Sequence, residues 1–92
     1  MSYSIELTPD AESDIEKHKK SGDKKILLKI DKLLNELRDH PTFGTGKPEQ
    51  LKHYDFPTWS RRISDKHRLV YRIQEDKVIV LILSFWGHYG NK

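Results

Sequence analysis

Residues 59–86 read WSRRISDKHRLVYRIQEDKVIVLILSFW, and this stretch contains three runs with the apolar pattern of β-strands. The predicted strands are Trp59–Ile63, His67–Gln74 and Val78–Trp86. Polar tripeptides at 64–66 and 75–77 separate the runs, so the three strands should form an antiparallel meander. In the third run the odd- and even-numbered positions, which face opposite sides of a strand, are both apolar, and this predicts a central strand with both faces covered.

The residues before this stretch predict one more strand and a helical hairpin. Residues 2–7 alternate polar and apolar side chains, as a half-buried strand does. A Thr-Pro pair then opens a helix over residues 9–20, and an aspartate caps a second helix over residues 23–39. A loop with two prolines and two glycines, residues 40–48, leads into the meander. The sequence therefore predicts a single α+β domain over residues 1–92, whose small twisted sheet carries its helices on one face.

The composition excludes several classes of site. The chain has 92 residues, no cysteine and a net charge of +3. The lack of cysteine excludes disulfides, thiolate zinc sites and a thiol nucleophile. The longest apolar run, Val78–Leu83, is far shorter than the roughly 20 residues that a membrane helix needs. No signal peptide opens the chain, so we expect a cytoplasmic protein that does not bind membranes.

Positive charge and aromatic rings are concentrated in the second half of the chain. Residues 1–48 carry nine basic and nine acidic side chains, whereas residues 49–92 carry eight and five. Eight of the nine aromatic residues lie at or after Phe43. Basic and aromatic residues together are typical of a surface that binds nucleic acid. A solvated basic face beside an aromatic core explains the same composition, so composition alone leaves both interpretations open.

Arginines in the predicted meander indicate a phosphate-binding face. The apolar residues at 69, 71 and 73 turn Arg68 and Arg72 to the opposite face of their strand. A three-residue turn would place Arg62 opposite Arg68, and like charges so placed are destabilising unless an anion lies between them. A planar guanidinium suits phosphate in that role. Alternatively, these side chains are solvated or paired with an acidic neighbour, namely Glu49, Asp55 or Asp65.

The end of the chain adds two groups suited to proton transfer. His88 carries an imidazole, which titrates near neutral pH, and the phenol of Tyr89 can stack on a base or donate its hydroxyl. The alternative is a frayed chain end without a function. The five histidines lack metal-ligand spacing, and residues 44–47 lack the pattern of a Walker phosphate loop. We therefore predict no metal and no other cofactor.

Four segments of the chain carry a recognisable set of motifs. They are Pro41–His53 (PTFGTGKPEQLKH), Trp59–Ile63 (WSRRI), His67–Tyr71 (HRLVY) and a terminal His88–Tyr89. In this order and spacing they resemble the Txe/YoeB toxins of the RelE/ParE superfamily. The resemblance implies a RelE-like fold and a toxin of a type II toxin–antitoxin module, which inhibits translation by cleaving mRNA on the ribosome.

The resemblance also implies roles for individual residues. Glu49 matches the general base of the family, Arg68 the phosphate-stabilising residue, His88 the general acid and Tyr89 the residue that positions the substrate. At residues 86–87 the chain has Trp-Gly where the family has Arg-Tyr, and three residues follow Tyr89. Basic side chains form the predicted set that binds RNA or the ribosome: Lys47, Lys52, Arg61, Arg62 and Arg72.

This set of groups is consistent with metal-independent cleavage through the RNA 2′-hydroxyl, and the hypothesis is that cleavage leaves a 2′,3′-cyclic phosphate and a 5′-hydroxyl. The resemblance implies three partners, namely the ribosome, mRNA and a cognate antitoxin with an acidic, partly disordered segment that covers the basic sheet face, and it allows a homodimer. Two other functions stay open. One is a non-catalytic inhibitor of DNA gyrase, as in the ParE branch, and the other is an RNA-binding module that cuts nothing.

Overall fold

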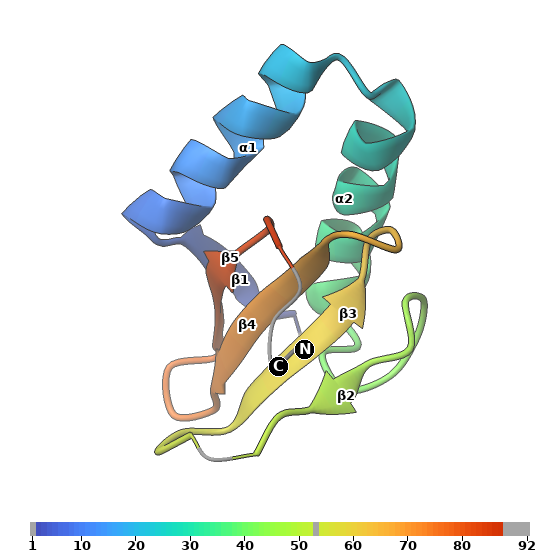
Figure 1. Cartoon of the computed structure of the whole chain (residues 1–92). Coiled ribbons are helices and arrows are strands. Elements are labelled where there is room, and N and C mark those ends of the chain that lie inside the picture. The colour runs from blue at the N-terminus through green and yellow to red at the C-terminus, as the bar shows by residue number, and fades with distance from the viewer. Residues whose placement is uncertain (1, 53, 88–92) are drawn as a thin grey trace.

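The computed structural model describes residues 2–52 and 54–87, which form two helices and one five-stranded sheet (Figure 1). Every predicted element is present, with ends that differ from the predicted ones by about two residues at most. One short strand, β2, was not predicted. In chain order the elements are β1 (Ser4–Leu7), α1 (Pro9–Ser21), α2 (Lys24–Leu37), β2 (Glu49–Gln50), β3 (Thr58–Arg62), β4 (Arg68–Gln74) and β5 (Ile79–Ser84).

Both helices begin at the predicted caps. The Thr8 hydroxyl accepts a hydrogen bond from the Ala11 amide, and the Asp23 carboxylate accepts one from the Ile26 amide. Gly22 ends α1 in the left-handed conformation at φ 76°, which lets α2 fold back beside α1 as a hairpin. Within the described ranges, neither helix is long and apolar enough to cross a membrane.

The sheet has the strand order β1-β5-β4-β3-β2. Strand β1 pairs with β5 in parallel, and the pairs β5–β4, β4–β3 and β3–β2 are antiparallel, as the predicted meander requires. The apolar run therefore forms a central strand, as predicted. Its residues Val80 and Ile82 are fully buried, but Ile79 and Leu81 on the other face are only half-buried. Among the described residues, that second face of β5 is thus covered only in part.

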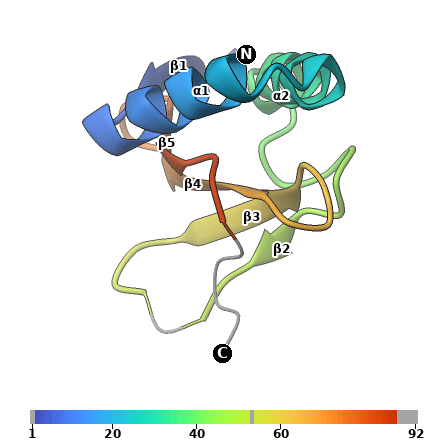
Figure 2. The same ribbon diagram turned by 45° about the horizontal axis from the view of Figure 1, so that its top comes forward.

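Both helices lie over the same face of the sheet (Figure 2), which confirms the predicted α+β class. The core between the two layers is formed by the apolar stripe of α2 and the inward residues of β4 and β5. The opposite face, which we call the open face, carries no helix. The largest buried apolar side chains are Leu33, Leu37, Leu69, Tyr71, Ile82 and Phe85.

Candidate active site on the open face

The register of the sheet places three of the predicted site residues on the open face. Arg62 of β3 lies directly opposite Arg68 of β4, as the turn length predicted. Glu49 of β2 lies opposite Ser60, so it is a diagonal neighbour of Arg62 on the same face. Directly opposite residues have Cβ atoms about 5 Å apart, and diagonal neighbours lie within about 8 Å. An acidic residue and two arginines therefore lie on one patch of the open face.

The geometry of this patch favours an anion. The Arg68 guanidinium donates through Nη1 to the carbonyl oxygens of Ser64 at 2.6 Å and His67 at 3.2 Å, which orients it over the β3–β4 turn. Arg62 and Glu49 are exposed, and within residues 2–52 and 54–87 neither side chain has an ion-pair partner. Like charges on directly opposite residues of neighbouring strands repel each other, and a phosphate bound by both arginines would relieve this repulsion.

Three other predicted binding residues lie on β4 or beside β2 in the sequence. Lys47 and Lys52 are exposed and flank β2, and Lys47 adopts a positive φ of 51°. Arg72 lies on the open face opposite Thr58, with its guanidinium carbon 4.1 Å from the ring centre of Phe56. His88 and Tyr89 lie outside the described residues, so their predicted roles stay predictions.

Arg61 does not belong to the surface on which it was predicted to bind RNA or the ribosome. It pairs with Leu69 on the helix-covered face of the sheet and has no exposed surface. A side chain in this position cannot contact RNA, so we remove Arg61 from the binding set. The alternation of β3 already contained this information, because Arg61 has the same parity as the inward-facing Trp59 and Ile63.

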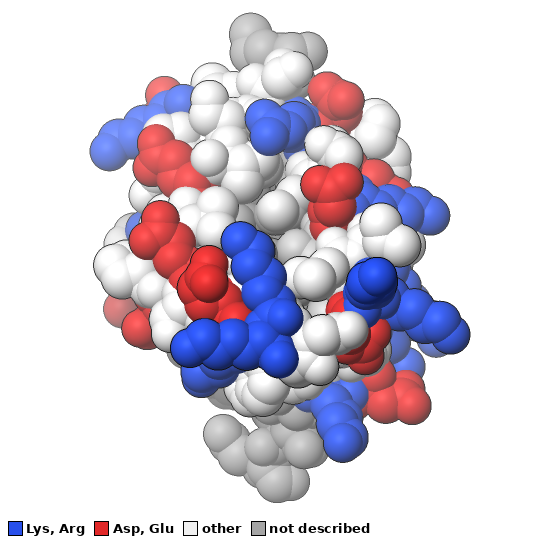
Figure 3. Space-filling model, turned by 90° about the horizontal axis from the view of Figure 1, so that it is seen from above, with Lys and Arg blue, Asp and Glu red and all other residues white. Residues whose placement is uncertain are grey.

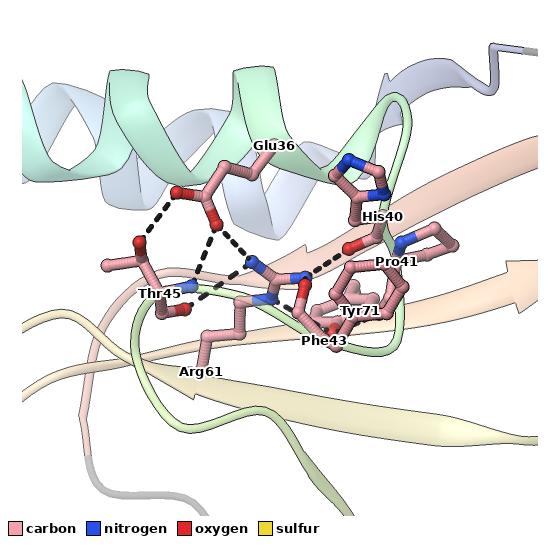
Figure 4. A network of polar contacts seen from close by, with 7 residues as sticks. All are labelled: Glu36, His40, Pro41, Phe43, Thr45, Arg61 and Tyr71. Atoms are coloured by element: carbon pink, nitrogen blue, oxygen red, sulfur yellow. Dashed lines mark hydrogen bonds and ion pairs between the residues drawn. The ribbon is translucent and has the colours of Figure 1, made fainter.

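Arg61 is instead the centre of a buried polar network (Figure 4). Its Nη1 lies 3.0 Å from Oε1 of Glu36 on α2, and its Nε donates to the Tyr71 hydroxyl at 3.2 Å. The other guanidinium nitrogen donates to the carbonyl oxygens of His40 and of Phe43, the latter at 2.9 Å. Each of the three guanidinium nitrogens therefore donates to an oxygen, as a buried charge requires.

The same network holds the loop that precedes β2. The Glu36 carboxylate accepts from the Thr45 amide at 2.8 Å and from the Thr45 hydroxyl at 2.6 Å, and Tyr71 donates to the Pro41 carbonyl at 2.6 Å. The loop then meets β3, because the Arg62 amide donates to the Gly46 carbonyl at 2.7 Å. The polar network therefore fixes the start of β2 and, with it, the backbone that carries Glu49.

Burial and hydrogen bonding change the ionisation of two network members. Burial alone would raise the pKa of Glu36, but hydrogen bonds from Thr45 and the charge of Arg61 outweigh it and hold that pKa below its ordinary value of 4.5. Burial raises the pKa of Tyr71 above 10.0, against the opposing effect of Arg61. Glu36 is therefore charged and Tyr71 neutral at physiological pH, as their roles of acceptor and donor require.

A second set of hydrogen bonds joins residues 85–87, at the end of the described chain, to α1 and β4. The Phe85 amide donates to Asp14 Oδ2 at 3.0 Å, and His18 Nε2 donates to the Phe85 carbonyl at 2.9 Å. At Gly87, the carbonyl accepts from the Arg68 amide at 2.9 Å. The segment therefore runs beside β4 as far as Arg68, and His88 is the next residue in the sequence.

The end of the molecule at which α1 meets α2 has a mixed surface charge, with basic and acidic side chains interspersed (Figure 3). A groove of about 700 Å³ lies between the helical hairpin and the β3–β4 turn, and residues of both signs line it, including Lys29, Lys66 and Asp65. Within the described ranges, no group of three or more metal-ligating side chains is close enough to hold a metal ion. The paired arginines thus single out the open face as the candidate site.

Comparisons with known proteins agree with this fold and with the motifs. The sequence model of the family described as the YoeB-like toxin of bacterial type II toxin–antitoxin systems matches residues 7–89. Toxin YoeB of Escherichia coli (strain K12) is 43% identical over 67 residues, which are 73% of this chain and 77% of that protein.

Solved structures of similar proteins have the same fold. A YoeB/ParE toxin from Agrobacterium tumefaciens is 32% identical, with a TM-score of 0.84 over 94% of this chain and 99% of that one. A YoeB dimer and a YoeB–YefM complex from Staphylococcus aureus are each 36% identical and cover 97% of this chain and 100% of theirs, with TM-scores of 0.77 and 0.76. This chain belongs to the family of YoeB-like toxins of bacterial type II toxin–antitoxin systems.

Proposed function

We propose that this toxin is a ribosome-dependent endoribonuclease that cleaves mRNA and so inhibits translation. The observation that carries the proposal is the shared position of Glu49, Arg62 and Arg68 on the open face. The hydrogen bond between Gly87 and the Arg68 amide supports it further, because the chain continues from Gly87 directly into His88. A base, a phosphate-binding pair and an acid are the groups that metal-free RNA cleavage requires.

In the proposed reaction, the Glu49 carboxylate takes the proton of the RNA 2′-hydroxyl. The 2′-oxygen attacks the adjacent phosphorus, and Arg68, with Arg62 opposite, stabilises the charge that develops on the phosphate oxygens. His88 donates a proton to the departing 5′-oxygen, and Tyr89 positions the substrate. The bond from phosphorus to the 2′-oxygen forms as the bond to the 5′-oxygen breaks, which leaves a 2′,3′-cyclic phosphate and a 5′-hydroxyl.

We also propose that a cognate antitoxin covers the open face. The Staphylococcus aureus relative has been solved in complex with YefM and also as a dimer, which supports an antitoxin partner and a homodimer for this chain. The face carries Arg62, Arg68 and Arg72, so an acidic, partly disordered antitoxin segment suits it. A ribosomal target places the toxin in the cytoplasm.

Mapping mRNA 5′ ends in a ribosome-containing extract, with and without the protein, tests the proposed function. We expect new 5′-hydroxyl ends within translated mRNA that do not form when ribosomes are removed. New ends that carry a 5′-phosphate would contradict the mechanism. Arrest of DNA replication with intact mRNA would instead support gyrase inhibition, and unbroken mRNA that stays bound to the protein would support an RNA-binding module.

Two variants assign the proton-transfer roles in the same assay. We expect Glu49→Ala and His88→Gln each to lower the cleavage rate by about 10²- to 10⁴-fold, the typical contribution of one positioned acid or base. Glu12→Ala is the matched control, because Glu12 is an exposed carboxylate on α1, outside the candidate site. Cleavage by Glu49→Ala at the rate of this control would remove Glu49 from the mechanism.

A further inference from the structure

The imidazole of His67 accepts a hydrogen bond from the backbone of the last described residue. Its Nδ1 lies 3.0 Å from the amide nitrogen of Gly87. A backbone amide can only donate, so Nδ1 must be unprotonated and the ring proton of the neutral imidazole must lie on Nε2. Only the tautomer with its proton on Nε2 can therefore accept the hydrogen bond from Gly87 at Nδ1.

This bond is one of a pair that joins Gly87 to two neighbouring residues of the chain. While His67 accepts from the Gly87 amide, the amide of Arg68 donates to the Gly87 carbonyl at 2.9 Å. Gly87 has a φ of 89°, in the region that favours glycine, and a Cβ there would meet nothing within 4 Å. Its conformation is therefore held by these two hydrogen bonds and not by crowding.

Trp86 and His18 hold the His67 ring in place. The centre of the Trp86 ring lies 4.3 Å from that of His67, and the His18 ring meets the His67 ring edge-on at 4.8 Å. The Lys17 ammonium lies over the Trp86 ring, with its Nζ 5.4 Å from the ring centre.

The surroundings of His67 favour its neutral form. Burial lowers the pKa of His67 below 6.5, as do the nearby His18 and Lys66, whereas Asp14 opposes them. A protonated ring would carry a proton on Nδ1 and could no longer accept from Gly87. The environment thus keeps the ring in the state that the hydrogen bond needs.

We propose that His67 is a positioning residue, whose Nδ1 fixes Gly87 against Arg68 and so sets where the chain enters His88. The proposal rests on the proposed function, in which Arg68 and His88 act on the same phosphate. In this role His67 acts through the backbone of Gly87 and not on the RNA or the reacting atoms. Its contribution is to fix the backbone that joins the acid to the phosphate-binding arginine.

Two substitutions separate this role from simple packing. In His67→Asn the side-chain oxygen takes the place of Nδ1 and can still accept from Gly87, whereas in His67→Gln the oxygen reaches the place of Nε2. Both variants lose the ring that packs on Trp86, so they are matched in that respect. In a ribosome-dependent cleavage assay, we expect His67→Gln to lower kcat by about 10²-fold, the effect of misplacing a reacting group by about 1 Å. We expect His67→Asn to retain at least about ten times more activity, with KM for ribosomes similar in both variants.

A second measurement does not depend on cleavage. We expect ¹⁵N NMR of the wild-type protein to show an unprotonated Nδ1 at His67, and hydrogen exchange at the Gly87 amide to be slow in the wild type and His67→Asn but fast in His67→Gln. Equal kcat in the two variants, or equal exchange at Gly87, would overturn the role of His67 alone. Absence of cleavage by the wild-type protein would overturn the proposed function and, with it, the effect of His67 on catalysis.

Discussion

Arg61 on β3 and Glu36 on α2 form an ion pair at 3.0 Å that joins the sheet to the helical layer and encloses the loop between them. The Arg61 side chain has no exposed surface, and the Glu36 side chain is 25% exposed. A guanidinium removed from water in this way is stable only because carbonyl, carboxylate and hydroxyl oxygens surround it. The loss of either partner leaves a buried group without its counterpart.

We therefore expect Arg61→Leu to be strongly destabilising. Removal of one partner of a buried pair typically costs about 3–5 kcal/mol, and here the Glu36 carboxylate and the carbonyls of three loop residues would lose the hydrogen bonds that Arg61 donates. Urea-induced unfolding of the purified toxin measures the change. Arg62→Leu is the matched control, because Arg62 is the next residue but is exposed, so its replacement should change stability by no more than about 0.5 kcal/mol.

The double variant Glu36→Leu/Arg61→Leu tests whether the loss reflects an uncompensated charge. Replacement of both partners by apolar residues leaves no unpaired ion, so the double variant should be more stable than the sum of the two single variants predicts. If Arg61→Leu and Arg62→Leu unfold at the same urea concentration, the network does not stabilise the fold.

The pKa of Glu36 predicts how stability depends on pH. The folded state holds this pKa below its ordinary value of 4.5, so Glu36 stabilises the fold fully above that value. The contribution is lost as the pH falls from about 4.5 through the lower pKa of the folded state. We expect Glu36→Gln to lower the free energy of unfolding at about pH 7 and to approach the wild type at about pH 3. An equal difference at both values would contradict the assigned role, and Glu12→Gln, at an exposed carboxylate, is the control.

Gly46 and Gly22 provide a comparison of two glycines with a positive φ. Both adopt this conformation, at 87° and 76°, so alanine should cost about 1–2 kcal/mol at either position. At Gly46, however, a Cβ would lie 2.9 Å from the Arg62 carbonyl oxygen, whereas nothing lies within 4 Å at Gly22. We expect Gly46→Ala to cost at least about 1 kcal/mol more than Gly22→Ala in urea unfolding, since the β2–β3 backbone must move. Equal losses would show that the approach of the loop to β3 is not tight.

Most of the fold was predictable because its signals are local. The caps at Thr8 and Asp23, the apolar run of β5 and the polar turns lie within a few residues of the elements that they define. Strand β2 was missed because two exposed residues carry no periodicity, and only the pairing with β3 makes them a strand. The parallel pairing of β1 with β5 likewise depends on contacts between the two ends of the chain.

The site was predictable to the extent that strand parity decides it. Parity placed Arg62 and Arg68 on one face and the length of the turn placed them opposite each other, and the structure confirms that pair. The same rule should have removed Arg61 from the binding set, but its partner Glu36 is 25 residues earlier in the sequence and no local pattern connects the two. The hydrogen bond from Gly87 to His67 spans 20 residues and was missed for the same reason.

Arg68 provides the sharpest test of the candidate site. We expect Arg68→Leu to lower kcat for mRNA cleavage on ribosomes by about 10²- to 10³-fold, the usual effect of removing one group that stabilises transition-state charge. Arg68→Lys keeps the charge but loses the planar fork, so its loss should be intermediate. Arg38→Leu is the control, because Arg38 is an exposed arginine at the end of α2. Since β4 is central to the sheet, circular dichroism and urea unfolding must first show that the variants fold. A folded Arg68→Leu that cleaves as fast as Arg38→Leu would mean that the phosphate is bound elsewhere, because no other residue that the structure describes lies opposite Arg62 on the open face.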